Sequence, residues 1–198
     1  KVLLCYTLNV EKEYLIIHNK EEISKEDIDK FNMYIKRLLN REPLQYITNK
    51  QEFMGLEFYV DKRVLIPQPD TEILVEEVIN ICKNFNNKKL DANTVGVDAH
   101  IDPKKEIENN NIKILDLCTG SGAIGISIAK YSESSVTMSD ISENALEIAK
   151  KNATSNEVID KCNFVLSDMF EDIDKKFDII VSNPPYIKTK VINTLDKE

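Results

Sequence analysis

The chain has 198 residues, of which 42% are hydrophobic and 30% charged, and its formal net charge is −8 at pH 7. This length fits one full domain and a smaller piece, and the acidic balance weakly disfavours a protein that coats nucleic acid. No apolar run approaches the ~18 residues of a membrane span, so we expect no membrane contact. The sequence begins at Lys1 without Met or a signal-peptide layout, and we expect a segment of a longer protein.

The four cysteines stand far apart in the sequence, and no Cys-x-x-Cys pair occurs. Only His18 and His100 could assist a metal site, so the spacing argues against bound zinc. Cysteines scattered among apolar residues are typical of a reducing compartment, and we predict a cytoplasmic location.

The first third of the chain predicts helices. Residues 1–23 mix apolar and charged positions, and we predict only that they are helical, without boundaries for the helices. Ser24 then begins a clearer helix, which it caps together with Asp27. Spacings of three and four place one apolar stripe on this helix, formed by Ile28, Phe31, Ile35 and Leu38. We interpret residues 1–42 as a small helical domain, which ends before Pro43.

Residues 43–69 are predicted to form a linker. The stretches 52–60 and 63–66 alternate enough in hydropathy to predict a short β-hairpin. Pro67 and Pro69 then stiffen a turn, after which a side chain at position 70 or 71 can cap a helix. The residues leave two interpretations of this turn open, a rigid connection between domains or a wall of an active site.

The helix after this turn carries one apolar face, with Leu74, Val78, Cys82 and Phe85. Asn, Lys, Asp and Glu dominate residues 86–111 without apolar periodicity, so we expect a mobile insertion there. Strands and helices then alternate, with strands at 112–117, 135–140, 162–167 and 178–182. This alternation predicts right-handed crossovers and a parallel, doubly wound α/β sheet.

A glycine-rich turn, Cys118-Thr119-Gly120-Ser121-Gly122, lies between the first strand and its helix. Gly120 and Gly122 lack side chains where a backbone must approach a ligand, and the helix N-terminus offers amide donors. Asp140 ends the second strand and can accept hydrogen bonds from both hydroxyls of a ribose. These features together predict a nucleoside cofactor.

Acidic residues narrow the choice of nucleoside. Asp116 lies two residues before the turn, where a carboxylate disfavours a pyrophosphate and suits a sulfonium with an ammonium tail. Asp168 ends the third strand and could accept from an adenine amine, with Met169 covering the ring. A helix cap or a loop carboxylate is an equally good interpretation of Asp168.

The tetrapeptide Asn183-Pro184-Pro185-Tyr186 follows the fourth apolar strand. Open α/β sheets bind ligands at the carboxyl ends of their strands. An amide, two rigid prolines and an aromatic ring at that edge predict a site for a planar amine or amide. A proline-rich turn without chemistry is the alternative.

The segments Asp116-Leu117-Cys118-Thr119-Gly120-Ser121-Gly122, Asp140 and the tetrapeptide resemble class I methyltransferases that use S-adenosylmethionine on planar nitrogens. Two upstream stretches resemble the peptide chain release factor N5-glutamine methyltransferases, the HemK/PrmC family: Pro43-Leu44-Gln45-Tyr46-Ile47 and Val64-Leu65-Ile66-Pro67-Gln68-Pro69-Asp70-Thr71-Glu72. The chain departs from the family at Cys118, where Gly is usual, and at Gln68, where Arg is usual.

The resemblance implies a Rossmann-like methyltransferase domain in residues 70–198, truncated after its fourth strand, behind a helical domain that recognises the substrate and a hairpin linker. A sheet cut there would leave the fourth strand as an apolar edge. The implied cofactor contacts are Asp116, Cys118, Thr119, Gly120, Ser121, Gly122, Asp140, Asp168, Met169 and Asn183. The implied substrate contacts are Asn183, Pro184, Pro185 and Tyr186, with Asn183, Pro184 and Tyr186 catalytic.

The resemblance therefore implies methyl transfer from S-adenosylmethionine to a glutamine amide of a release factor, with no direct nucleic-acid binding. Three alternatives stay open. They are an adenine-N6 nucleic-acid methyltransferase, a nicotinamide-dependent oxidoreductase and a fragment that binds the cofactor without activity.

Overall fold

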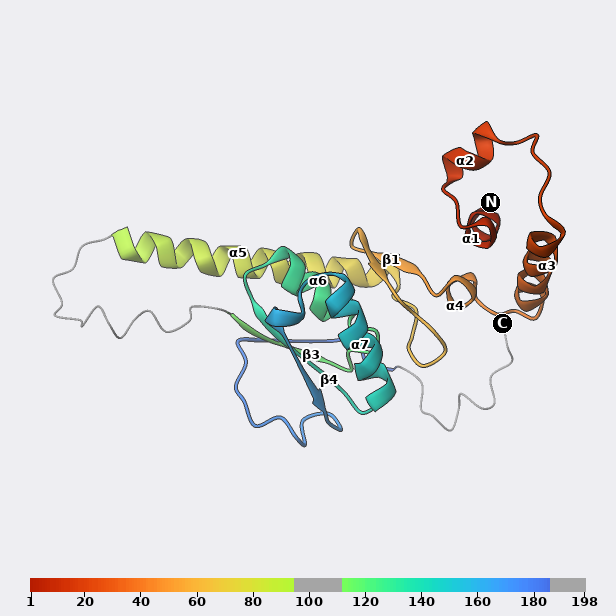
Figure 1. The fold of residues 1–198 in the computed structure, drawn as a ribbon. Coiled ribbons are helices and arrows are strands. Elements are labelled where there is room, and N and C mark those ends of the chain that lie inside the picture. The colour runs from red at the N-terminus through yellow and green to blue at the C-terminus, as the bar shows by residue number, and fades with distance from the viewer. Residues whose placement is uncertain (95–111, 186–198) are drawn as a thin grey trace.

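The computed structural model describes residues 1–94 and 112–185 (Figure 1). Four helices form its N-terminal part: α1 (Val2–Leu8), α2 (Lys12–Ile17), α3 (Lys25–Leu39) and α4 (Leu44–Thr48). The Ser24 hydroxyl accepts a hydrogen bond from the Asp27 amide at 3.1 Å, which confirms the predicted cap of α3. Leu3, Tyr34 and Ile47 form the buried centre of this helical part. Ile28 is 46% exposed, so the predicted stripe on α3 is wrong at its first position.

The predicted hairpin is present, but both of its strands lie within residues 51–58, instead of in the two predicted stretches 52–60 and 63–66. β1 (Gln51–Phe53) pairs with antiparallel β2 (Leu56–Phe58), and residues 63–66 form no strand. Met54 and Gly55 both have positive φ, at 53° and 70°, as a two-residue hairpin turn requires. Phe53 and Phe58 are buried and pack edge to face, which holds the hairpin on the core.

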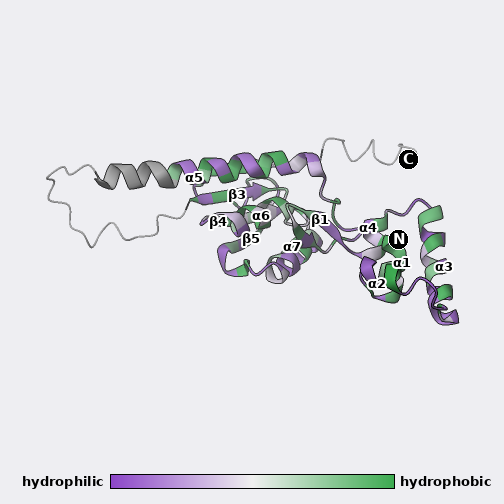
Figure 2. Ribbon diagram, turned by 90° about the horizontal axis from the view of Figure 1, so that it is seen from above, coloured by the Kyte–Doolittle hydropathy of each residue, from purple (hydrophilic) through white to green (hydrophobic). Residues whose placement is uncertain are grey.

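The turn with two prolines continues as a short 3₁₀ helix, Pro69–Thr71, directly into α5 (Glu72–Thr94). Val78 and Cys82 are buried, whereas Phe85 is 52% exposed. The helix continues to Thr94, so the insertion expected from residue 86 is wrong for 86–94, and 95–111 lie outside the described residues. Residues 86–94 are polar but contain neither Gly nor Pro, so their backbone can remain helical. Hydrophobic and hydrophilic residues alternate along α5 in Figure 2, as in a helix that buries one side.

Four parallel strands form the sheet: β3 (Lys113–Leu117), β4 (Ser135–Asp140), β5 (Cys162–Leu166) and β6 (Ile179–Ser182). Their order, β5-β4-β3-β6, places the first strand of the sheet between the second and the fourth. The crossovers contain α6 (Ala123–Tyr131), α7 (Glu143–Ser155) and a 3₁₀ helix, Ile159–Lys161 (Figure 1). The predicted parallel α/β sheet is confirmed. The strand order reverses between β3 and β6, where sheets of this kind bind ligands.

The main core lies between the sheet and helices α5 and α6, with Ile114, Ile126 and Val136 completely buried. Within the described ranges, β6 pairs only with β3, and Ile180 on this edge strand is 54% exposed. The helices of residues 1–94 and 112–185 include none long and apolar enough to cross a membrane.

Candidate functional site

The glycine-rich turn is held against the ends of β3 and β4 by its own backbone. Cys118, Gly120 and Gly122 have positive φ, at 61°, 56° and 82°. The Thr119 amide donates to the Ser139 carbonyl at 2.9 Å, and the Gly120 amide donates to Asp140 Oδ2 at 2.8 Å. Asp140 thus lies beside the turn, as the sequence predicted for a ribose-binding carboxylate.

The two glycines of the turn differ in what surrounds them. A Cβ on Gly122 would lie 2.7 Å from Ile126 Cδ1 and 3.1 Å from Ala149 Cβ, so its small size lets the turn pack on α6 and α7. A Cβ on Gly120 would meet nothing within 4 Å. Open space for a ligand therefore lies beside Gly120. At Gly122, close packing against α6 and α7 explains why the residue is a glycine.

Asp116 is completely buried at the end of β3. Its Oδ2 accepts from the Thr119 hydroxyl at 2.6 Å and from the Gly125 amide at 3.0 Å. Its Oδ1 is buried without a hydrogen-bond partner in the described parts of the chain. Burial raises the pKa of Asp116 to about 7, against the effect of the two hydrogen bonds. The Gly125 amide, near the start of α6, therefore donates to Asp116, and Oδ1 is left as a buried acceptor without a partner among the described residues.

Further carboxylates surround Cys118. Burial raises the pKa of its thiol, and the charges of Asp140, Asp116 and Asp168 raise it further. The Cys118 sulfur lies 3.9 Å from the Met169 sulfur. The structure therefore brings together the residues that the sequence placed around the cofactor at the ends of three strands. An accumulation of negative charge favours a ligand with positive charge over a pyrophosphate.

Asn183 connects this group to the linker. Its side-chain amide donates to the Thr71 hydroxyl at 3.3 Å, and it lines one pocket together with the glycine turn. The other wall of this pocket comes from the linker, through Leu65, Pro67 and Gln68, and from Thr71 just after it. Of the two interpretations of the turn with two prolines, the pocket wall is the one that the structure supports. Pro184 and Pro185 are exposed, and Tyr186 lies outside the described residues.

Sequence reasoning missed Asn152, which is completely buried on α7. Its side chain accepts from the Tyr59 amide and donates to the carbonyls of Tyr59 and Ser121. A polar residue on a helix face that otherwise carries Ile148, Ala149 and Ala153 was the available signal. Thr71 was considered only as a helix cap, although its hydroxyl orients Asn183.

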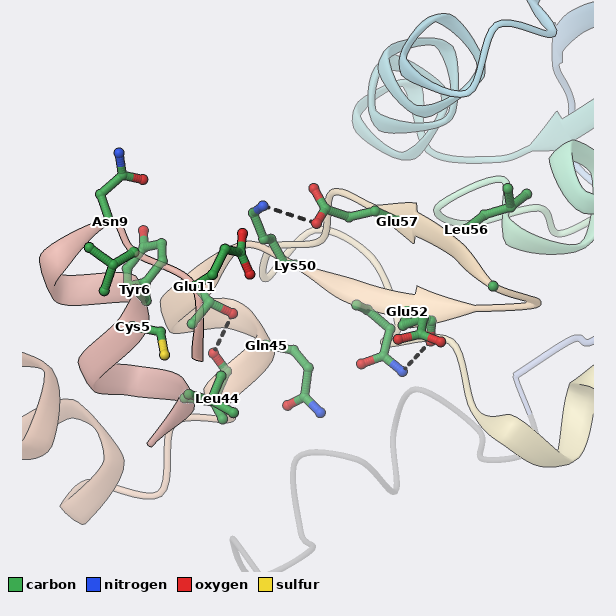
Figure 3. Close-up of a pocket in the computed structure, with 15 residues that line it drawn as sticks. Cys5, Tyr6, Asn9, Glu11, Leu44, Gln45, Lys50, Glu52, Leu56 and Glu57 are labelled. Carbon is green, nitrogen blue, oxygen red and sulfur yellow. Dashed lines mark hydrogen bonds and ion pairs between the residues drawn. The ribbon is translucent and has the colours of Figure 1, made fainter. Parts of the chain in front are cut away.

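A larger hollow of about 610 Å³ lies elsewhere, between the N-terminal helices and the hairpin (Figure 3). Lys50 and Glu57 form an ion pair of 2.9 Å on its wall, with Glu11 and Gln45 close by in the same hollow. None of the predicted site residues lines it. The glycine turn and Asn183 meet in the smaller pocket instead. Among the described residues, no group of three or more His, Cys, Asp or Glu could hold a metal ion.

The reversal of strand order, the glycine turn after β3 and the carboxylate at the end of β4 define a Rossmann-like nucleoside-binding fold. The chain belongs to the methyltransferase small domain family, whose model matches residues 77–196. Residues 1–48 match the model of the PrmC N-terminal domain. These matches confirm the predicted methyltransferase class and the S-adenosylmethionine-dependent fold.

Three relatives show the extent of the similarity. The release factor glutamine methyltransferase of Clostridium acetobutylicum is 40% identical, over 98% of this chain and 61% of its own length. The protein of the same name from Fusobacterium nucleatum is 40% identical, over 96% of this chain and 48% of its own length. The bifunctional methyltransferase of Rickettsia typhi is 41% identical, over 94% of this chain and 35% of its own length. The chain thus spans 35–61% of these relatives.

Proposed function

We propose that the protein transfers a methyl group from S-adenosylmethionine to the side-chain amide nitrogen of a glutamine in a peptide chain release factor. The observation that carries this proposal is the pocket shared by the glycine turn, the linker and Asn183. Two relatives that match almost the whole chain are named for the same activity, which supports it.

The residues beside the glycine turn fit S-adenosylmethionine. Asp116 has an unpaired buried oxygen for the ammonium of the amino-acid end. The two oxygens of Asp140 accept from the Gly120 and Ser142 amides, and their remaining lone pairs would accept from the ribose hydroxyls. Asp168 and Met169 would lie on the adenine side. When bound, the cofactor supplies a methyl group carried on a sulfonium, and the neutral thioether that remains after the transfer is a good leaving group. The carboxylates offset its positive charge and hold it in one orientation.

The acceptor nitrogen needs placement more than a base. An amide nitrogen is a poor nucleophile because its lone pair is delocalised into the carbonyl group. Thr71 accepts from Asn183 Nδ2 and so orients the Asn183 amide, whose Oδ1 would accept one hydrogen of the substrate amide. The Pro184 carbonyl would accept the other hydrogen, and Tyr186 would pack on the flat amide. These acceptors favour the positive charge that develops on nitrogen, and the proton leaves after the transfer.

The helical part is proposed to recognise the release factor. Ile16, Ile17 and Leu39 expose 69%, 76% and 76% of their surface, so this part of the chain offers apolar side chains that a partner would cover. Such a substrate places the protein in translation termination in the cytoplasm. All four cysteines are free thiols, which agrees with a reducing compartment.

Asn183→Ala tests the proposed role of the tetrapeptide in the full-length protein. Methyl transfer to release factor should fall by about 100-fold or more, because a positioned acceptor is lost. Affinity for S-adenosylhomocysteine should fall far less than turnover, because Asn183 is one implied cofactor contact among ten and the carboxylates beside the turn are intact. Ser182→Ala is the matched control, since Ser182 precedes Asn183 but does not line the pocket, and its hydroxyl interacts with the Leu117 carbonyl and the Cys118 thiol. Turnover by Asn183→Ala equal to that of the control would overturn the role.

A further inference from the structure

Asn152 connects three segments that lie far apart in the sequence. Its Oδ1 accepts from the Tyr59 amide at 2.8 Å, and its Nδ2 donates to the Tyr59 carbonyl at 3.0 Å. The same Nδ2 donates to the Ser121 carbonyl, inside the glycine turn, at 2.9 Å. One side chain of α7 thus holds both the segment after β2 and the turn that faces the cofactor.

The site is built to keep this side chain in place. Asn152 has no exposed surface, so each hydrogen bond it makes offsets the cost of burying an amide. The next residue of the turn, Gly122, packs against Ala149, almost one helical turn before Asn152. Helix α7 therefore supports the glycine turn through close packing at Gly122 and through a hydrogen bond at Ser121.

The other end of the connection leads to the pocket wall. Tyr59 is followed by the buried Val60 and Val64, and the Val64 carbonyl accepts from the Tyr46 hydroxyl at 2.8 Å. Leu65 and Pro67, which come next, line the pocket opposite the glycine turn. A displacement at Tyr59 would therefore move one wall of the pocket while Asn152 holds the other.

We propose that Asn152 is a positioning residue for cofactor binding, which fixes the spacing between the glycine turn and the linker. It contributes to affinity for the adenosyl cofactor and acts through the Ser121 carbonyl, without contacting the reacting atoms. The inference rests on the proposed function only for the identity of the cofactor.

Asn156 provides a matched comparison on the same helix. Its Nδ2 donates to the Glu57 carbonyl at 3.1 Å and to the Asn152 carbonyl at 3.0 Å. It therefore also holds β2 on α7, but its hydrogen bonds do not reach the glycine turn. A change in cofactor affinity that appears at Asn152 and not at Asn156 comes from the bonds that Asn152 alone makes, to Tyr59 and to the Ser121 carbonyl of the turn.

The test compares Asn152→Asp with Asn156→Ala in the full-length protein, using S-adenosylhomocysteine and titration calorimetry. Asn152→Asp keeps an acceptor for the Tyr59 amide and loses both donated bonds. Only the lost bond to Ser121 reaches the glycine turn, so the dissociation constant should rise about tenfold, the usual effect of one lost buried hydrogen bond, while Asn156→Ala stays within about twofold. In methyl transfer, the KM for S-adenosylmethionine should rise with kcat little changed. Wild-type affinity in Asn152→Asp, or equal losses in both variants, would overturn the proposal.

A measurement on the unaltered protein covers the case in which Asn152→Asp does not fold. Hydrogen exchange of the Tyr59 amide should slow when S-adenosylhomocysteine binds, because the turn and the linker are joined through Asn152. Unchanged exchange at Tyr59 with saturating ligand would contradict the connection. Neither the calorimetry nor the hydrogen-exchange measurement needs a release factor. A protein that binds the cofactor but methylates no glutamine would therefore refute the proposed function and leave this inference standing.

Discussion

Replacing Asp116 by Asn should stabilise the free protein and weaken its binding of the cofactor. Burial raises the pKa of Asp116 from 3.8 to about 7. A raised folded-state pKa means that the stabilising contribution of this group is complete below pH ~4 and is lost as the pH rises through about 7. The full difference corresponds to about 4 kcal/mol, which is an upper bound because the protein relaxes around a buried charge.

Asn is close to Asp in shape, and its side-chain oxygen in the place of Oδ2 can accept both bonds that Thr119 and Gly125 donate there. We therefore expect Asp116→Asn to gain about 1–3 kcal/mol in urea unfolding at pH 8 and little or nothing at pH 4. The comparison of the two pH values is the internal control, since a gain from packing alone would be equal at both.

Cofactor binding should show the opposite effect. The ammonium of S-adenosylhomocysteine favours the ionised carboxylate, so wild-type affinity should rise about tenfold from pH 6 to pH 8. Asp116→Asn should bind more weakly at pH 8 and lose this pH dependence. Titration calorimetry across this range measures both effects. Wild-type affinity that does not vary with pH, together with a variant that is less stable at pH 8, would refute the role of the unpaired Asp116 oxygen.

Three further substitutions test the architecture. Cys118→Gly relieves a positive φ of 61° and should raise stability by up to about 1 kcal/mol in thermal unfolding, with cofactor affinity retained. Gly122→Ala places a methyl 2.7 Å from an Ile126 carbon at a φ of 82°, and should cost about 1–3 kcal/mol and weaken cofactor binding. Glu72→Ala removes the acceptor of the Met54 amide and should cost about 1 kcal/mol without changing cofactor affinity. We expect the contact of Glu72 with the hairpin to be independent of the glycine turn. A loss of cofactor affinity in Glu72→Ala as large as that in Gly122→Ala would contradict this expectation.

The sheet could be predicted closely because its patterns are local. Each strand is a short apolar run bounded by polar or glycine residues, and the predicted strand at 135–140 agrees with β4. Ser24 accepts the predicted capping hydrogen bond from the Asp27 amide. Capping depends on residues three positions apart, and the sequence shows these directly.

The errors came from features that are not local. The two hairpin strands were predicted too far apart in the sequence. Residues 52–60 look like one continuous strand, but the turn at Met54 and Gly55 divides them. Helix α5 runs past Phe85 although its composition becomes polar, because no helix-breaking residue follows before Thr94. The composition of a segment indicates how much apolar surface it can bury. The end of a helix depends instead on capping and helix-breaking residues.

The candidate site was only partly visible in the sequence. The glycine turn, Asp116 and Asp140 follow from their positions at strand ends. The contact between Asn183 and Thr71 spans 112 positions, and the bonds from Asn152 to Tyr59 span 93, so no local pattern could show either. Such contacts appear only when the linker and the sheet are placed together.

The central claim is tested most directly by locating the transferred methyl group. The full-length protein is mixed with methyl-labelled S-adenosylmethionine and a peptide chain release factor, and the products are digested and sequenced by mass spectrometry. The account predicts one label on the side-chain nitrogen of a glutamine of the release factor, lost in Asn183→Ala. Label on nucleic acid or on another residue type, or a release factor without label while the cofactor binds, would contradict it.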